Sequence, residues 1–98
     1  MADRTKTLAD LGLTAREGRN PVLRGITLDS RAVEDGFLFA AMPGSAVHGA
    51  SYIELALARG AVAILTDAAG ARLAAQVLAD SDAALIVAED PREAIARA

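Results

Sequence analysis

The sequence predicts a small layered α/β domain, in which a mostly parallel or mixed sheet is flanked by helices. From Ser51 onward the signals alternate as helix, strand, helix, strand, helix. This order is typical of parallel strands joined by right-handed crossovers. Residues 61–65 and 84–88 are continuous apolar runs, as in strands that are buried on both faces. We therefore expect both runs to be central strands of the sheet.

The first half of the chain has weaker signals. We expect residues 5–11 to form a short helix and residues 14–25 to form a polar loop. A half-buried strand is expected at residues 26–28, where apolar and polar side chains alternate. A second strand is expected at residues 37–42, after a turn at residues 34–36.

The helices of the second half carry explicit start and end signals. Ser51 and Glu54 form an S-x-x-E capping box, and Gly60 suits the left-handed residue that ends a helix. Thr66 or Asp67 is expected to cap the second helix. The inner stripe of that helix is expected to be Leu73, Ala74, Val77 and Leu78.

The last helix is expected to begin near residue 90. Asp90 is the predicted N-cap, Pro91 occupies the first helical position, and Glu93 closes a second capping box. The chain continues for only about two turns beyond this start, which is short for a helix. We therefore expect residues 1–98 to be one domain cut from a longer protein.

Composition excludes several classes of function. The chain has 98 residues, of which 53% are hydrophobic, enough for a single modest core. The net charge is −3 and aromatic residues make up 3%, so a nucleic-acid partner is not expected. The absence of cysteine and the single histidine, His48, exclude thiolate and multi-histidine metal sites within this chain. No apolar run is long enough to cross a membrane, and we expect a cytoplasmic protein.

Two segments are candidate binding loops. Asp29, Ser30 and Arg31 follow a predicted strand, and α/β folds often bind ligands at such positions; alternatively, they only form a turn. The loop between Gly44 and Gly49 could offer backbone N–H groups to an anion, or could simply lead into the helix at Ser51. It is not a phosphate-binding loop of the G-x-x-x-x-G-K-[ST] type, because the only lysine is Lys6. His48 is either a ligand contact or a surface residue.

The stretch GITLDSRAVEDGFLFAAMPGSAVHGASYIELALARGAVAILTD, residues 25–67, resembles the N-terminal domain of the Mur ligases of peptidoglycan synthesis. The matching features, in order, are the strand running into LDSR, the G-x-LF-A-x-x-G segment, the loop reaching Gly49, the helix ending in ARGA and the strand AVAIL. The resemblance is greatest to the type that extends UDP-N-acetylmuramoyl-L-alanyl-D-glutamate, the MurE type.

The resemblance implies a binding site for the uridine diphosphate (UDP) part of that substrate. Leu28 and Ser30 would contact the nucleotide, while Asp29 and Arg31 would hold the turn. The loop that would close over the nucleotide consists of Ser45, Ala46 and Val47. Relatives usually have Asp-Gly where this chain has His48-Gly49, and Tyr52 stands near a usual Phe. These departures concern the side chains of the loop and not its backbone role.

The family reaction is ATP-dependent amide ligation, with ATP and magnesium held by a central domain and the incoming amino acid by a C-terminal domain. The resemblance therefore implies that residues 1–98 bind substrate without a cofactor or catalytic residue of their own, and are inactive alone. Two alternatives stay open: the first domain of the dipeptide-adding Mur ligase, and a stand-alone ligand-binding α/β module. Whether diaminopimelate or lysine is added is also open.

Overall fold

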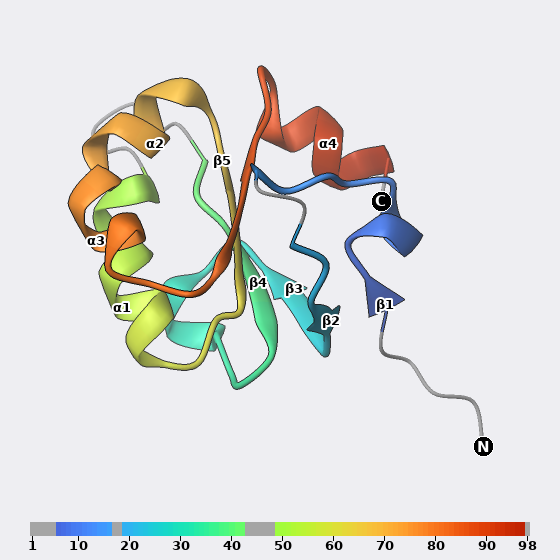
Figure 1. The fold of residues 1–98 in the computed structure, drawn as a ribbon, viewed down its shortest axis with the longest axis horizontal. Coiled ribbons are helices and arrows are strands. Elements are labelled where there is room, and N and C mark those ends of the chain that lie inside the picture. The colour runs from blue at the N-terminus through green and yellow to red at the C-terminus, as the bar shows by residue number, and fades with distance from the viewer. Residues whose placement is uncertain (1–5, 17–18, 43–48, 98) are drawn as a thin grey trace.

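A parallel four-stranded sheet lies between two layers in the computed structural model, which describes residues 6–16, 19–42 and 49–97 (Figure 1). The sheet order is β3-β4-β5-β6, and all neighbouring pairs are parallel. Its strands are β3 (Gly25–Thr27), β4 (Phe37–Ala40), β5 (Ala63–Thr66) and β6 (Ala84–Val87). The helices are α1 (Ile53–Ala58), α2 (Ala68–Leu73), α3 (Ala75–Ala79) and α4 (Pro91–Arg97). The predicted α/β class is confirmed.

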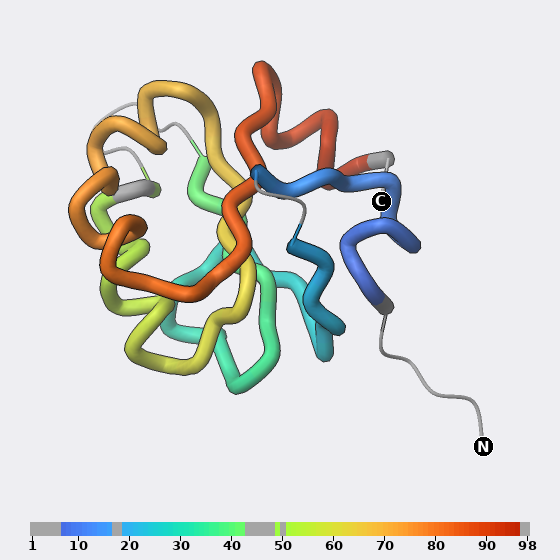
Figure 2. The backbone as a smooth tube through the Cα atoms, viewed as in Figure 1, coloured from blue at the N-terminus to red at the C-terminus, as the bar shows by residue number. Residues whose placement is uncertain are grey.

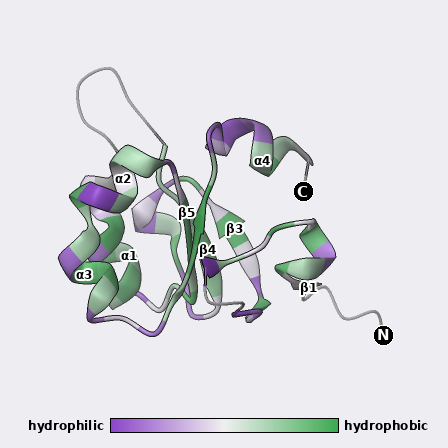
Figure 3. Cartoon of the chain, turned by 45° about the horizontal axis from the view of Figure 1, so that its top comes forward, coloured by the Kyte–Doolittle hydropathy of each residue, from purple (hydrophilic) through white to green (hydrophobic). Residues whose placement is uncertain are grey.

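One face of the sheet is covered by α1, α2 and α3 (Figure 1). Phe39 and Ile64 point to this side and pack with Ile53 of α1 and Ala74, which joins α2 to α3. Alternate residues of the same strands face the other way, because successive side chains in a strand point to opposite faces. Buried apolar side chains therefore lie on both faces, and Figure 3 colours β5 largely as hydrophobic.

The other face is covered by α4 and by the N-terminal segment (Figures 1 and 2). Leu38 and Leu65 of the sheet pack there with Leu8, Leu13 and Leu23. Two short strands, β1 (Lys6–Thr7) and β2 (Val22–Leu23), form a separate antiparallel pair in this layer. The N-terminal segment is thus part of the core.

This pairing corrects two expectations. Residues 6–11 do not form a single helix, because Lys6–Thr7 is a strand and only Ala9–Leu11 forms a 3₁₀ turn. Within the expected loop 14–25, Val22–Leu23 is a strand. The physical reason is long-range: Lys6 pairs with Leu23, so a partner distant in sequence overrides the local helical pattern.

The predicted capping box at Ser51 is wrong as the start of α1. Gly49–Tyr52 forms a 3₁₀ helix, and Tyr52 is the N-cap of α1 without a side-chain capping bond. Such turns often precede an α-helix. At the other end, Gly60 has a φ of 105°, which confirms the left-handed residue predicted there.

The predicted second helix is divided. Asp67 Oδ1 accepts a hydrogen bond from Gly70 N at 2.7 Å, which confirms the N-cap of α2. Ala74 separates α2 from α3, so the predicted helix consists of two short helices. Ala74 is buried and Val77 and Leu78 are half-buried, as predicted. Leu73, however, is 69% exposed, so its predicted place on the inner stripe is wrong.

The sheet also corrects the predicted place of its last strand. β5 is central and all four of its residues are buried. β6 lies at an edge of the sheet, and burial alternates along it, so residues 84–88 are not a central strand.

The predicted start of α4 is confirmed. Asp90 Oδ1 accepts hydrogen bonds from the backbone N–H groups of Arg92 and Glu93, and Pro91 is the first helical residue.

Candidate functional site

The candidate site lies at the carboxyl edge of the sheet. β3 and β4 are neighbouring parallel strands, with Thr27 opposite Phe39. Their carboxyl ends are therefore side by side, and the two predicted binding segments leave the sheet at adjacent positions. This edge is where open α/β sheets commonly bind ligands.

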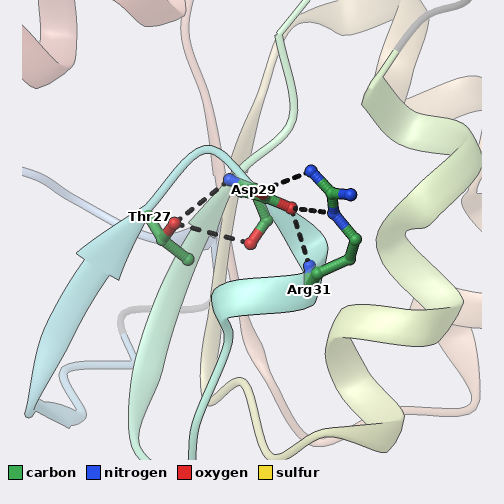
Figure 4. A network of polar contacts seen from close by, with 3 residues as sticks. All are labelled: Thr27, Asp29 and Arg31. Carbon is green, nitrogen blue, oxygen red and sulfur yellow. Dashed lines mark hydrogen bonds and ion pairs between the residues drawn. The ribbon is translucent and has the colours of Figure 1, made fainter.

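The side chains of Thr27, Asp29 and Arg31 form a polar network at the end of β3 (Figure 4). Asp29 N donates to Thr27 Oγ1 at 3.1 Å, a local turn in which a hydroxyl replaces a backbone acceptor. Asp29 Oδ1 accepts from Arg31 N at 2.9 Å and thereby caps the 3₁₀ helix Ser30–Ala32. Asp29, Ser30 and Arg31 were expected from the sequence, but Thr27 was missed. The sequence signal for this contact is a threonine two residues before an aspartate, at positions 27 and 29.

The same Asp29 and Arg31 form a two-point ion pair. Arg31 Nε lies 3.1 Å from Asp29 Oδ1, and Arg31 Nη2 lies 3.1 Å from Asp29 Oδ2. The Arg31 hydrogen bonds, first from the side chain and then from the backbone N–H, lower the pKa of Asp29. The hydrogen bond and charge of Asp29 raise the pKa of Arg31, with a smaller contribution from Tyr52. The pair is solvent-exposed, with the two side chains 85% and 49% accessible.

Ser30 and Leu28 differ in their surroundings. Leu28 is 54% exposed, so the expected half-buried strand presents this apolar side chain outward; Ile26 is exposed in the same way. Ser30 is only 8% exposed. Its hydroxyl makes no hydrogen bond within the described ranges. In those ranges, every side-chain nitrogen or oxygen atom that is fully shielded from solvent has a hydrogen-bond partner. The remaining exposure of Ser30 therefore includes its hydroxyl oxygen.

For the second segment, the structure describes only the residues on either side of the loop, Met42 and Gly49, which we call the loop neck. Gly49 N donates to Met42 O at 2.7 Å, which brings the two ends of the loop together. A Cβ on Gly49 would lie 2.7 Å from Met42 N, so only glycine allows this approach. The predicted binding residues Ser45, Ala46 and Val47, together with His48, lie outside the described residues.

The described part of the chain offers no metal site and no membrane-spanning helix. No group of three or more His, Cys, Asp or Glu residues there is arranged to hold a metal ion. None of the helices in those ranges is long and apolar enough to span a bilayer. The described groups at the carboxyl edge are the Ser30 hydroxyl, the exposed side chain of Leu28 and the exposed pair of Asp29 and Arg31.

Comparison with known proteins gives a family match over most of the chain. The model described as "Mur ligase family, catalytic domain" matches residues 22–98. Among curated proteins, the UDP-N-acetylmuramoyl-L-alanyl-D-glutamate--2,6-diaminopimelate ligase of Streptomyces coelicolor is 46% identical over 86 residues, which is 87% of this chain and 16% of that protein. The enzyme of the same name from Zymomonas mobilis is 45% identical over 85 residues, again 87% and 16%.

Solved structures share the fold. Crystal structure II of MurF from Acinetobacter baumannii has a TM-score of 0.74 at 21% identity, covering 96% of this chain and 20% of that one. A UDP-N-acetylmuramoylalanyl-D-glutamyl-2,6-diaminopimelate--D-alanyl-D-alanyl ligase from the same organism has a TM-score of 0.69 at 18% identity, covering 99% and 22%. The chain thus spans about a sixth of the length of the curated relatives, 16% in the first case.

Proposed function

The chain belongs to the Mur ligase family, and we propose that it binds the UDP part of UDP-N-acetylmuramoyl-L-alanyl-D-glutamate. Leu28 and Ser30 would contact the nucleotide from one side, and Ser45, Ala46 and Val47 would close over it from the other. Asp29 and Arg31 would hold the turn. Residues 1–98 are then the substrate-binding domain of a larger cytoplasmic ligase.

The observation that carries the proposal is the position of the Ser30 hydroxyl. It belongs to an otherwise buried residue, reaches solvent at the carboxyl edge, and makes no hydrogen bond within the described ranges. Leu28, two residues earlier in the same segment, has a 54% exposed apolar side chain on which a base can lie. A hydroxyl paired with an apolar surface suits a nucleotide, which presents polar edges and a flat face.

The full protein would be an ATP-dependent amide ligase. ATP and magnesium would be held by a central domain, and the incoming amino acid by a C-terminal domain. Binding the UDP part would place the reacting carboxylate in the central domain, so that binding energy far from the reaction contributes to positioning. The printed names of the curated relatives favour extension with 2,6-diaminopimelate.

The dipeptide-adding type is the second candidate, because MurF structures share the fold. The identities of 45–46% to diaminopimelate ligases, against 21% to MurF, favour the first candidate. The stand-alone module is disfavoured by the family match over residues 22–98.

A titration of the isotope-labelled 98-residue chain with UDP tests the proposal. We expect chemical-shift changes at residues 28–31 and 44–49. Ser30→Ala should weaken binding by up to about tenfold, the value of one hydrogen bond. Ala46→Trp should also weaken binding, by blocking backbone approach, without lowering the melting temperature.

ADP serves as the control ligand, because it has the same diphosphate with a different base. Shift changes confined to other residues would contradict the proposed site. So would a UDP affinity that is unchanged in both variants.

A further inference from the structure

We propose that Asp29, Arg31 and Thr27 are positioning residues that hold the Ser30 hydroxyl in place for a nucleoside diphosphate. The proposal rests on the proposed function and extends it, because it names the side chains on which the Ser30 contact depends. The observation behind it is the polar network of Thr27, Asp29 and Arg31 at the end of β3 (Figure 4).

The backbone on both sides of Ser30 is held by side chains rather than by the sheet. On one side, Asp29 N donates to Thr27 Oγ1 at 3.1 Å. On the other, Arg31 N donates to Asp29 Oδ1 at 2.9 Å. The Arg31 N bond holds the peptide group after Ser30. The peptide group before Ser30 is held through Asp29 O, which accepts from Thr27 Oγ1 at 3.4 Å and from Ala32 N at 2.9 Å. Together these bonds limit the direction of the Ser30 Cα–Cβ bond. The hydroxyl itself makes no bond within the described ranges that would orient it.

The Asp29 carboxylate is oriented in turn by Arg31. Both of its oxygens are engaged, at 3.1 Å from Nε and 3.1 Å from Nη2, and two-point contacts fix the plane of a carboxylate as well as its distance. An ion pair as exposed as this one contributes little to folding stability. Its effect is therefore expected mainly in the geometry of the turn.

Direct contact between Arg31 and the diphosphate is the competing explanation. Arg31 directs Nε and Nη2 at Asp29, whose carboxylate neutralises much of its charge, so the positioning role is favoured. The two explanations differ in one respect. A residue that acts through Ser30 has no effect once the Ser30 hydroxyl is removed, whereas a direct contact remains.

A double-mutant cycle with UDP separates them. We expect Arg31→Gln to weaken UDP binding about threefold, less than the loss from Ser30→Ala, because the turn loosens without losing the hydroxyl. In the Ser30→Ala background, Arg31→Gln should cause no further loss, which is the coupling expected of residues that act as a unit. Equal losses in both backgrounds would overturn the proposal, because Arg31 would then act independently of the Ser30 hydroxyl.

Two variants of Asp29 test whether UDP binding depends on the hydrogen bond from Arg31 N or on the ion pair with the Arg31 side chain. Asp29→Asn keeps an Oδ1 acceptor for Arg31 N and loses the charged pair, whereas Asp29→Ala loses both. We expect Asp29→Ala to weaken binding more, and to speed hydrogen exchange at the Arg31 amide in the absence of ligand. Equal exchange rates in the two variants would contradict the capping role.

Arg24→Gln is the matched control, because it removes an exposed arginine just before β3, at the opposite end of that strand. It should bind UDP like the wild type. If the wild type itself fails to bind UDP, the proposed function and this inference both fail. If the wild type binds, Ser30→Ala weakens binding and Arg31→Gln does not, the inference alone fails.

Discussion

At the scale of single residues, the turn after β3 combines three chemically different groups within five positions. Thr27 accepts a backbone hydrogen bond, Asp29 accepts from both backbone and side chain, and Arg31 donates from both. Each group bonds to another in the set, and because Asp29 and Arg31 are solvent-exposed, water would replace a side chain that is removed without restoring the geometry of the turn. The effect of a substitution here should therefore be visible first in a neighbouring residue.

Arg31→Gln is expected to raise the pKa of Asp29 toward the ordinary aspartate value of about 3.9. The wild-type pKa is lowered chiefly by the hydrogen bond from the Arg31 side chain, and the variant keeps only the backbone hydrogen bond. The pKa is measured from the carboxyl carbon-13 shift during a pH titration. An unchanged midpoint would show that the ion pair does not form in solution.

The sign of the stability effect follows from this shift. Because the folded-state pKa of Asp29 is lowered, its carboxylate stabilises the fold above the unfolded-state pKa, near 3.9. That contribution is lost as the pH falls through the lower folded-state value. Any difference in melting temperature between the wild type and Arg31→Gln should therefore be present at neutral pH and shrink below about pH 4.

Gly60→Ala is expected to destabilise the fold more than Gly12→Ala. Both glycines have positive φ, 105° and 75°, where an L side chain costs roughly 1–2 kcal/mol. A Cβ on Gly60 would also lie 2.8 Å from the Asp35 Cα, whereas a Cβ on Gly12 would have no neighbour within 4 Å. Urea denaturation measures both losses. Equal losses would mean that the contact between Gly60 and Asp35 is not close in solution.

At the scale of elements, the two faces of the sheet explain which apolar residues are essential. Ile64 in the central strand β5 is fully buried, while Leu73 at the end of α2 is largely exposed. Both residues belong to apolar patterns in the sequence. Their burial differs because one lies between two layers and the other lies on the outside of a helix.

Ile64→Asp is expected to prevent folding, because an unpaired carboxylate in a dry core costs several kcal/mol, comparable with the stability of a small domain. Leu73→Asp is the matched control and should cost about 1 kcal/mol or less, from helix propensity and the nearby helix end. Far-UV circular dichroism and thermal melting distinguish the two. A cooperatively melting Ile64→Asp variant would contradict the buried position of β5.

At the scale of the whole molecule, the N-terminal segment and α4 together complete the second layer (Figure 2). The buried leucines Leu8, Leu13 and Leu23 reach the same face of the sheet as Ile95 of α4. The fold is therefore closed by parts of the chain from opposite ends of the sequence. Loss of either part would expose the apolar face formed by Leu38 and Leu65.

Leu8→Ala is expected to lower the free energy of unfolding by about 2–5 kcal/mol, the usual cost of truncating a buried leucine. Leu8 is 1% exposed, whereas Leu55 on α1 is 44% exposed, so Leu55→Ala should cost clearly less. Both values are obtained from urea denaturation with unchanged m. Similar small losses would indicate that the N-terminal segment does not pack on the sheet in solution.

Local sequence patterns were enough to predict the features that depend on a few neighbouring residues. The strands β4, β5 and β6, the caps Asp67 and Asp90, and the left-handed Gly60 are all close to where local patterns predict them. At the candidate site, the same local reasoning identified the turn at residues 29–31. Caps, turns and short apolar runs act within about one helical turn or one strand, so their signals survive in a single sequence.

The remaining features of the fold and of the candidate site depend on contacts between distant parts of the chain. The pairing of Lys6 with Leu23, the start of α1 at Ile53, the edge position of β6 and the outward direction of Leu28 depend on which surfaces meet. The same holds at the candidate site, where parallel pairing of β3 with β4 brings the turn and the loop neck together. Such contacts join residues far apart in the chain, and their free energy comes from burying shared apolar surface against the entropy of closing the loop between them.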